Sequence, residues 1–507
     1  MENSVEIKDQ LIKNGFWNIV TSMINRFGGF IIIILLSRLL MPEGFGRYSL
    51  AITIALFFIT ISDMGINQAL VRYVALGIDK KTNQSASYMN YFFKIKFFIA
   101  LLLSLILFIL AYPLSFFVFK DGNLFFPFLI LSFYVLFTSL AGFFESLFYI
   151  KKNVRYISIK EFIFLVIKIA GILIISFFIS SEYNLIGIFS LFLVISVLTL
   201  FFNFYFSKKS HPLLFKKANP IIDKKEISKF ILFLGVQNIA ATFIAMISII
   251  LLGIFLAEKY VGYYNAAWAL VIGISALLFS FSFILLPVLT NADKQRFQLI
   301  LKKIFRLFFI LALPVSFGLS FLSRYFISVI YGNEYLSASI PLSILSFIIP
   351  CMIGVDLALS SFSAKNKLKK FTLWMSVFAL IFFVLNYIFI SIFLNYSEEI
   401  VIIGVSIANL IGWFFCFVFS IFLLKKELGI TIFSMSTLKP FFSCLIMSAF
   451  IFFVTSKIQE INFLNGILII FSSGLVYLIS LFLIKGIEKE EIKEIVKILL
   501  KHDKNNL

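Results

Sequence analysis

The chain has 507 residues, of which 61% are hydrophobic and only 14% are charged, whereas soluble globular domains carry about 45–50% apolar and about 25% charged residues. This composition excludes a soluble domain. The formal net charge of +19 is carried by short segments between apolar runs, which favours a membrane surface over nucleic acid as the reason for the basic excess.

Apolar runs of about 20 residues, each long enough to cross the hydrocarbon core, predict an all-α polytopic membrane protein. In chain order, the predicted transmembrane helices are fourteen, at residues 16–40, 48–70, 91–112, 125–150, 157–180, 184–206, 229–256, 263–286, 304–326, 335–361, 371–394, 399–424, 437–456 and 463–485. Residues 1–15 and 486–507 are polar flanks, and the second flank has the pattern of an amphipathic helix at the membrane interface.

The lysines and arginines indicate the orientation of these helices. Of 44 in the chain, 36 fall on the side that carries both termini, 6 fall on the other side, and Arg26 and Lys168 lie inside predicted spans. Because cytoplasmic loops carry the excess of lysine and arginine, we expect a multi-pass protein of the cell (inner or plasma) membrane with both termini in the cytoplasm.

The first part of the chain is repeated in the second. Residues 31–54 align without gaps with residues 247–270 at an offset of 216, so that Gly46 corresponds to Gly262 and Tyr48 to Tyr264. Each copy has six spans, an even number, so the two copies have the same orientation and are related by an axis along the membrane normal. Two parallel, pseudo-symmetric bundles of this kind are typical of alternating-access transporters.

The repeat also predicts the domain organisation. Two six-helix bundles are joined by a lysine-rich cytoplasmic linker, and two further spans and a charged cytoplasmic tail follow the repeat. The predicted boundaries are 1–206 and 229–425 for the bundles, 207–228 for the linker, 426–485 for the two additional spans and 486–507 for the tail.

Four charged residues are candidates for the transport site. Arg26 and Lys168 each lie roughly 15 Å from the cytoplasmic surface at 1.5 Å per residue, and two cations at one depth suit a substrate that carries phosphate. The alternative is that both cations pair with carboxylates inside the bundle. Asp63 lies at a depth where it could neutralise Arg26, and Asp63 and Glu145 are candidates for ion coupling or for charge partners.

Enzymatic and metal sites are not expected. Cys351, Cys416 and Cys444 lie in apolar spans without paired spacing, and the chain has only two histidines, both in polar segments, so no metal site and no cofactor are predicted. The short outer loops disfavour a membrane glycosyltransferase or ligase, which needs a loop-built acceptor site with a catalytic acid or base.

Two segments resemble a known family. Residues 37–49 (SRLLMPEGFGRYS) and 63–72 (DMGINQALVR) resemble the first outer turn and the following segment of the polysaccharide transporter family, and Tyr331 to Ala338 resembles its second-half counterpart. That family contains the Wzx-type O-antigen flippases of the multidrug/oligosaccharidyl-lipid/polysaccharide (MOP) exporter superfamily. Residues 21–30 are also similar to the first helix of the peptidoglycan-precursor flippases, which implies a substrate-facing role for Arg26.

This resemblance implies a flippase that moves a polyprenyl-(pyro)phosphate-linked oligosaccharide, such as an O-antigen or capsule repeat unit, from the cytoplasmic to the outer leaflet. Membrane lipid, H+ or Na+, and polysaccharide polymerases or glycosyltransferases are the candidate partners, and nucleic acid is not. A cation-coupled multidrug exporter of the same superfamily is the alternative function, and a membrane glycosyltransferase or ligase is the alternative from another class.

Overall fold

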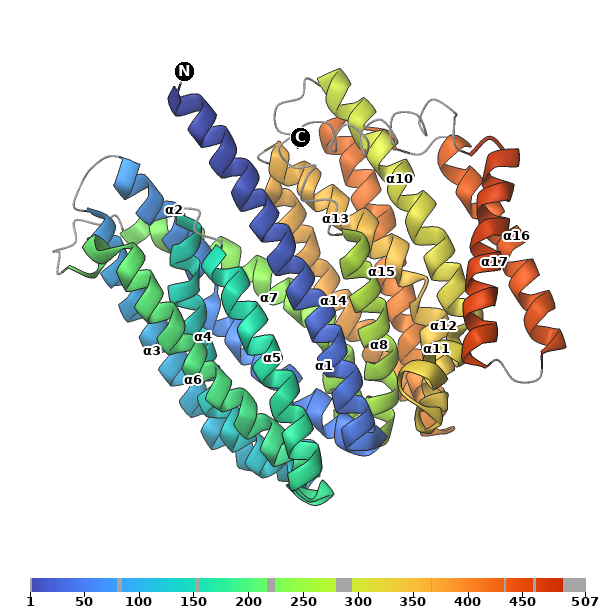
Figure 1. The fold of residues 1–507 in the computed structure, drawn as a ribbon, viewed down its shortest axis with the longest axis horizontal. Helices are drawn as coiled ribbons and strands as arrows, with labels where there is room; N and C mark the ends of the chain where they lie inside the picture. The colour runs from blue at the N-terminus through green and yellow to red at the C-terminus, as the bar shows by residue number, and fades with distance from the viewer. Residues whose placement is uncertain are drawn as a thin grey trace. The chain divides into compact units, whose positions relative to one another are not determined.

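The computed structural model describes residues 2–79, 84–150, 155–216, 224–279, 294–365, 367–432, 435–458 and 462–486. Within these ranges all regular structure is helical, as expected for backbone that satisfies its own hydrogen bonds inside a bilayer (Figure 1). The predicted tail helix after residue 486 and part of the predicted linker lie outside the described residues. The helices are α1 (Glu2–Asp63), α2 (Ile66–Asp79), α3 (Gln84–Pro113), α4 (Phe125–Ile150), α5 (Arg155–Phe178), α6 (Asn184–Ser210), α7 (Lys224–Phe255), α8 (Glu258–Phe279), α10 (Lys294–Phe321), α11 (Ser323–Ile330), α12 (Ser339–Leu345), α13 (Ile348–Ala364), α14 (Leu368–Phe393), α15 (Glu398–Leu428), α16 (Met435–Lys457) and α17 (Phe463–Leu483).

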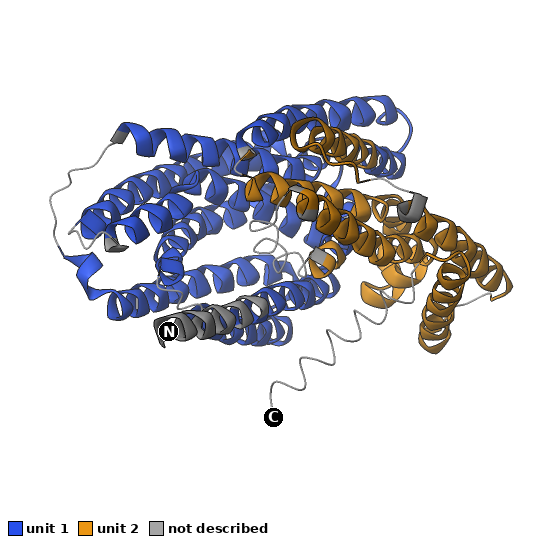
Figure 2. Ribbon diagram, turned by 90° about the horizontal axis from the view of Figure 1, so that it is seen from above, with its two compact units in different colours: residues 1–273, 369–408 blue, residues 274–368, 409–507 orange. Residues whose placement is uncertain are grey.

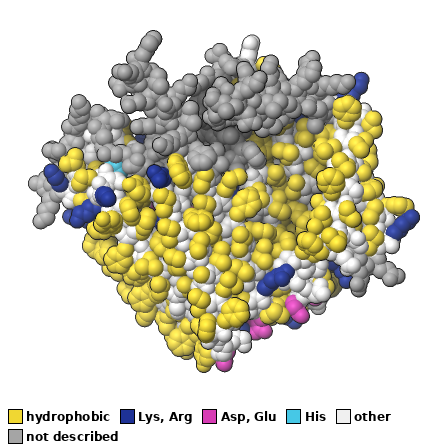
Figure 3. Space-filling model, in the orientation of Figure 1, with side chains coloured by type: hydrophobic (Ala, Val, Ile, Leu, Met, Phe, Trp, Pro, Cys, Tyr) yellow, Lys and Arg dark blue, Asp and Glu magenta, His cyan; other side chains and the backbone are white. Residues whose placement is uncertain are grey.

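Within the described ranges, twelve helices are long and apolar enough to cross a membrane, or thirteen when one bent pair counts as a span. The first of these, Val20–Gly77, runs through both of the first two predicted spans, which brings the count close to the predicted fourteen. Hydrophobic side chains dominate the face shown in Figure 3, with lysines and arginines near its edges. The chain is therefore a multi-pass helical membrane protein.

The turn between the first two spans is tighter than the sequence predicts. Only Met41 leaves helical geometry, with φ 57° and ψ 172°, and Pro42 begins the next helical arm of α1. Proline suits this place because the first residue of a helix needs no N–H donor. Residues 42–46, which lie between the predicted helices 16–40 and 48–70, are therefore already helical.

Prolines lie within the ninth and tenth predicted spans, and the two spans differ in shape. Pro314 lies inside α10, which continues through it as one helix. The tenth predicted span is broken at Ser346 and Phe347, and its two parts, 333–345 and 348–364, meet at an angle of 48°. Pro350 lies in the first turn of α13, directly after the break.

The described chain forms two compact units (Figure 2). The first comprises residues 1–273 and 369–408, and the second comprises residues 274–368 and 409–507. The second unit contains the two additional helices, where Met447 of α16 and Ile469 and Tyr477 of α17 pack against α10. The six-helix boundaries predicted from the repeat remain a prediction.

Inside the first unit, repeat-related glycines meet. A Cβ atom added to Gly46 of α1 would lie 1.8 Å from the carbonyl oxygen of Glu258, and one added to Gly262 of α8 would lie 2.1 Å from that of Pro42. Pro42 and Glu258 are themselves separated by the repeat offset of 216. Contacts of this reciprocal kind occur where a two-fold axis passes between two copies of one surface.

A hydrogen bond continues the same contact. Asn265 Nδ2 donates to Ser49 Oγ at 2.7 Å, and these two residues are also 216 positions apart. The pseudo-two-fold axis of the predicted repeat therefore passes between the second arm of α1 and the start of α8.

Candidate functional site

A polar cavity of about 240 Å³ lies among α4, α5 and α6, in the first unit. Its lining side chains recur at helical spacing, so that one face of each helix meets the cavity. The polar or charged members are Tyr134, Thr138 and Glu145 of α4, Lys160, Glu161 and Lys168 of α5, and Ser196 and Thr199 of α6.

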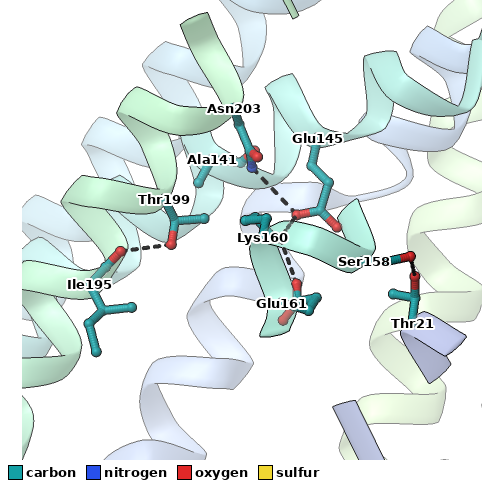
Figure 4. A network of polar contacts seen from close by, with 9 residues as sticks. All are labelled: Thr21, Ala141, Glu145, Ser158, Lys160, Glu161, Ile195, Thr199 and Asn203. Carbon is teal, nitrogen blue, oxygen red and sulfur yellow. Dashed lines mark hydrogen bonds and ion pairs between the residues drawn. The ribbon is translucent and has the colours of Figure 1, made fainter. Parts of the chain in front are cut away.

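Three of these charges form one ion-paired network. Lys160 is 4% exposed, and its Nζ lies 2.5 Å from Glu145 Oε2 and 2.6 Å from Glu161 Oε1 (Figure 4). Asn203 of α6 is fully buried and donates from Nδ2 to Ala141 O at 3.0 Å and to Glu145 Oε2 at 3.5 Å. Glu145 thus has a lysine as its charge partner, from α5.

Lys168 lies on the same face of α5, two turns beyond Glu161. It is partly buried, lines the cavity and lies in electrostatic range of Glu161 and Lys160. Within the described ranges its Nζ takes part in no ion pair and no hydrogen bond. The cavity therefore contains a cation that is available to an anionic group.

Arg26 has other surroundings. Thr21 and Gly28 of α1 face α5, through a 2.6 Å hydrogen bond between the Thr21 and Ser158 hydroxyls and through the side chain of Leu165 beside Gly28. Arg26 lies about 160° round the helix from Gly28, on the side of α1 that carries Phe30. Arg26 is partly buried there and is not among the residues that line the α4–α6 cavity.

Asp63 is paired with a lysine that the sequence reasoning missed. Lys96 of α3 is 1% exposed, and its Nζ donates to Asp63 Oδ1 at 3.2 Å and to Ser62 O at 3.1 Å. Among the described residues Lys96, and not Arg26, is thus the charge partner of Asp63. The pair lies at the break between α1 and α2, where Met64 and Gly65 have positive φ values of 40° and 79°.

Lys96 and Lys160 were counted with the charges of the cytoplasmic side, although both lie inside predicted spans, 91–112 and 157–180. The structure buries both lysines, at 1% and 4% exposure. α3 begins at Gln84, seven residues before the predicted span, and Lys96 belongs to its buried face together with Phe92, Ala100 and Ser104. The spacing of four residues from Phe92 to Lys96 and on to Ala100 is the sequence signal that could have identified it. Lys160 lies in α5, five residues after its first residue, Arg155.

The side chains that line the cavity are suited to binding a polar molecule. No group of three or more histidine, cysteine, aspartate or glutamate residues in the described part of the chain could hold a metal ion. The three cysteines are buried, and none forms a disulfide bond in the described part of the chain. The cavity instead offers a lysine ammonium, paired carboxylates and hydroxyl groups, which can bind a charged, hydroxyl-rich molecule.

Comparison with protein families identifies the chain. Residues 11–293 match the family described as "Polysaccharide biosynthesis protein". The chain belongs to this family. No curated protein sequence matches the chain.

Solved structures share the fold. A structure described as "Lipid II flippase MurJ, inward closed conformation" superposes with a TM-score of 0.74 at 19% identity, over 92% of this chain and 97% of the other. An inward-facing multidrug resistance MATE family transporter of the MOP superfamily superposes with a TM-score of 0.59 at 14% identity, over 80% and 95% of the two chains. The chain therefore shares its fold with a lipid II flippase and with a multidrug transporter of the MOP superfamily.

Proposed function

We propose that this protein flips a polyprenyl-(pyro)phosphate-linked oligosaccharide, a repeat unit of a surface polysaccharide such as O-antigen or capsule, from the cytoplasmic to the outer leaflet. Membership of a polysaccharide-biosynthesis family supports a saccharide cargo, and the fold supports transport across the membrane. The observation that carries the proposal is Lys168, an ammonium group that faces a polar cavity without an ion-pair partner among the described residues.

Lys168 has the role of binding the anionic part of the cargo, either the pyrophosphate or an acidic sugar, while the hydroxyl groups of Ser196 and Thr199 face the sugar. Arg26 is the second proposed binding residue, on another face of α1. The polyprenyl tail stays in the bilayer, because its transfer out of lipid would cost about 0.8 kcal/mol for each CH₂ group.

The proposed orientation is that of the sequence analysis, with both termini in the cytoplasm of a cell whose inner or plasma membrane contains the protein. The contact around Gly46 and Gly262 then lies at the outer side. Alternating access requires that this contact opens when the cargo leaves toward the outer leaflet.

The test measures transport by purified protein in proteoliposomes, with a leaflet-accessibility assay on a polyprenyl-pyrophosphate-linked saccharide. Lys168→Met and Arg26→Ala should each abolish or strongly reduce transport without lowering the amount of folded protein. Lys208→Met, which removes an exposed lysine at the end of α6, is the matched control and should transport normally. Full transport by the Lys168→Met protein contradicts the proposed site.

A multidrug exporter is the second candidate, since a MATE transporter shares the fold. Such an exporter needs a carboxylate that attracts an organic cation. Asp63 and Glu145 are both paired with lysines here, which disfavours this function. Transport of a fluorescent cationic dye by the same proteoliposomes, without transport of the saccharide lipid, would favour it.

A further inference from the structure

The carboxylates at Asp63 and Glu145 have a common arrangement. Each lies on an apolar helix, and each is paired with a buried lysine from a neighbouring helix: Lys96 at 1% and Lys160 at 4% exposure. We propose that Lys96 and Lys160 act as tethered cations, which occupy positions where the protein would otherwise bind a monovalent metal ion such as Na+.

The oxygen atoms around Lys96 support this proposal. Its Nζ lies 3.1 Å from the main-chain carbonyl of Ser62 and 3.2 Å from Asp63 Oδ1, at the end of α1. Helix breaks with freed carbonyls and a carboxylate are places where membrane transporters hold Na+. A carbonyl and a carboxylate are also the hard oxygen ligands that alkali and alkaline-earth cations prefer.

Two further oxygens belong to the same break. Ser62 is fully buried, and its Oγ has no hydrogen-bond partner among the described residues. The buried Oδ1 of Asn67, in the first turn of α2, also has none. Buried polar atoms without a partner are rare. The break therefore has more oxygen atoms that could coordinate a cation than the Lys96 ammonium group contacts.

The Glu145 site repeats this arrangement. Lys160 Nζ lies between two carboxylate oxygens, at 2.5 Å from Glu145 and 2.6 Å from Glu161. Asn203 Oδ1 is buried without a hydrogen-bond partner among the described residues, although its Nδ2 reaches Glu145. Removal of Lys160 would leave two carboxylates facing each other, which attracts a cation strongly.

The ammonium group of a lysine is covalently attached to the protein, so it cannot dissociate as a bound metal ion can. The ammonium group carries the same charge as Na+, and its cost of desolvation is met within the folded chain and not at each transport cycle. The inference is therefore that the folded protein needs no bound Na+ at either carboxylate, and that removal of the lysine alone creates a metal-ion site.

The test is the thermal stability of purified protein in detergent, measured in choline chloride and in NaCl at equal ionic strength, with KCl and LiCl as further conditions. The wild-type melting temperature should not depend on the cation. Lys96→Met should melt at a lower temperature in choline, and NaCl should raise its melting temperature toward the wild-type value with saturation, because a ligand that binds only the folded state stabilises it. Lys160→Met should respond in the same way.

Two variants serve as controls. Lys94→Met removes an exposed lysine of α3 two residues before Lys96 and should show no specific response to Na+. The double variant Asp63→Asn/Lys96→Met removes both charges and should lose the response of Lys96→Met. The proposal is overturned if both single variants fold and neither is stabilised by Na+, K+ or Li+ relative to choline. If Lys96→Met does not fold in any salt, Lys160→Met decides between these outcomes. The readout needs no cargo, so it is independent of the proposed flippase function.

Discussion

The contact between Gly46 and Gly262 allows a quantitative prediction. In Gly46→Ala, the new methyl group would lie 1.8 Å from the carbonyl oxygen of Glu258 and 2.6 Å from its carbonyl carbon, and both are backbone atoms that cannot rotate away. α8 must therefore retreat until the distance is at least 3.0 Å. Extra groups in a packed contact cost about 1–3 kcal/mol.

A net loss of about 1.4 kcal/mol would shift the equilibrium between the closed and open states of this contact tenfold toward the open state. Ser49 reports on it, because it is 1% exposed and accepts the hydrogen bond from Asn265. In a background without Cys351, Cys416 and Cys444, a cysteine introduced by Ser49→Cys should react with a membrane-impermeant maleimide about ten times faster when Gly46→Ala is added.

The matched control is Gly29→Ala, in the first arm of the same helix, where an added Cβ has no heavy atom within 4 Å. It should leave the labelling rate unchanged. An unchanged labelling rate in Gly46→Ala, or an equal rise in Gly29→Ala, would show that the clash at Gly46 does not open this contact. A labelling rate that rises only for Gly46→Ala supports the view that the contact between Gly46 and Gly262 closes one side of the protein.

Three further predictions concern packing and buried charges, and melting temperature measures each. Gly466→Ala should destabilise the contact of α17 with α11, because its Cβ would lie 1.9 Å from Tyr325 Cζ, whereas Gly474→Ala, with open space around it, should not. Arg47→Ala removes the 2.6 Å ion pair of Asp121, which is 7% exposed, and should lower the melting temperature far more than Glu43→Ala, whose carboxylate is 61% exposed. Asn203→Leu should lower the free energy of unfolding by about 1–3 kcal/mol, because Ala141 O and Glu145 lose a hydrogen-bond donor inside the bundle. For Gly466→Ala, Arg47→Ala and Asn203→Leu, an unchanged melting temperature would contradict the contact from which the prediction is made.

The repeat and the fold class could be predicted from the sequence because both depend on long-range regularities. Hydrophobic runs of membrane length specify helices, and an ungapped offset of 216 specifies which residues are equivalent. The structure then brings Ser49 and Asn265 together at that same offset. The small residues Gly46 and Gly262 were visible in the alignment, but only coordinates show that they touch each other.

The charged residues were predicted less well, because a lysine near the end of a span can either reach the membrane surface or be buried between helices. Lys96 lies five residues inside the predicted third span but was counted with the cytoplasmic charges, and this error concealed the partner of Asp63. Lys168 was identified correctly as a charge inside a span, and the structure places it in a polar cavity. Its expected neighbour Arg26 does not line that cavity, because the rotation of α1 about its axis follows from packing against α5 and not from depth in the membrane.

The paired carboxylates lead to a last prediction, about the driving force. If Asp63 and Glu145 are neutralised by tethered lysines, neither binds a coupling ion, and an anionic cargo remains the charge that moves. Carrying one negative charge outward across 100 mV, inside negative, is favourable by about 2.3 kcal/mol, which corresponds to about a 50-fold difference in distribution between the leaflets.

Proteoliposomes with a potassium gradient and valinomycin can set this potential without Na+. We expect transport of the saccharide lipid to follow the sign of the potential and to be unaffected by exchange of Na+ for choline at zero potential. The Lys96→Met protein is the informative comparison, because a metal ion bound at the vacated position would make its transport depend on Na+. If a Na+ gradient alone drives accumulation of the saccharide lipid by the wild-type protein, a coupling ion binds elsewhere. The lysine-paired carboxylates then do not determine the driving force of transport.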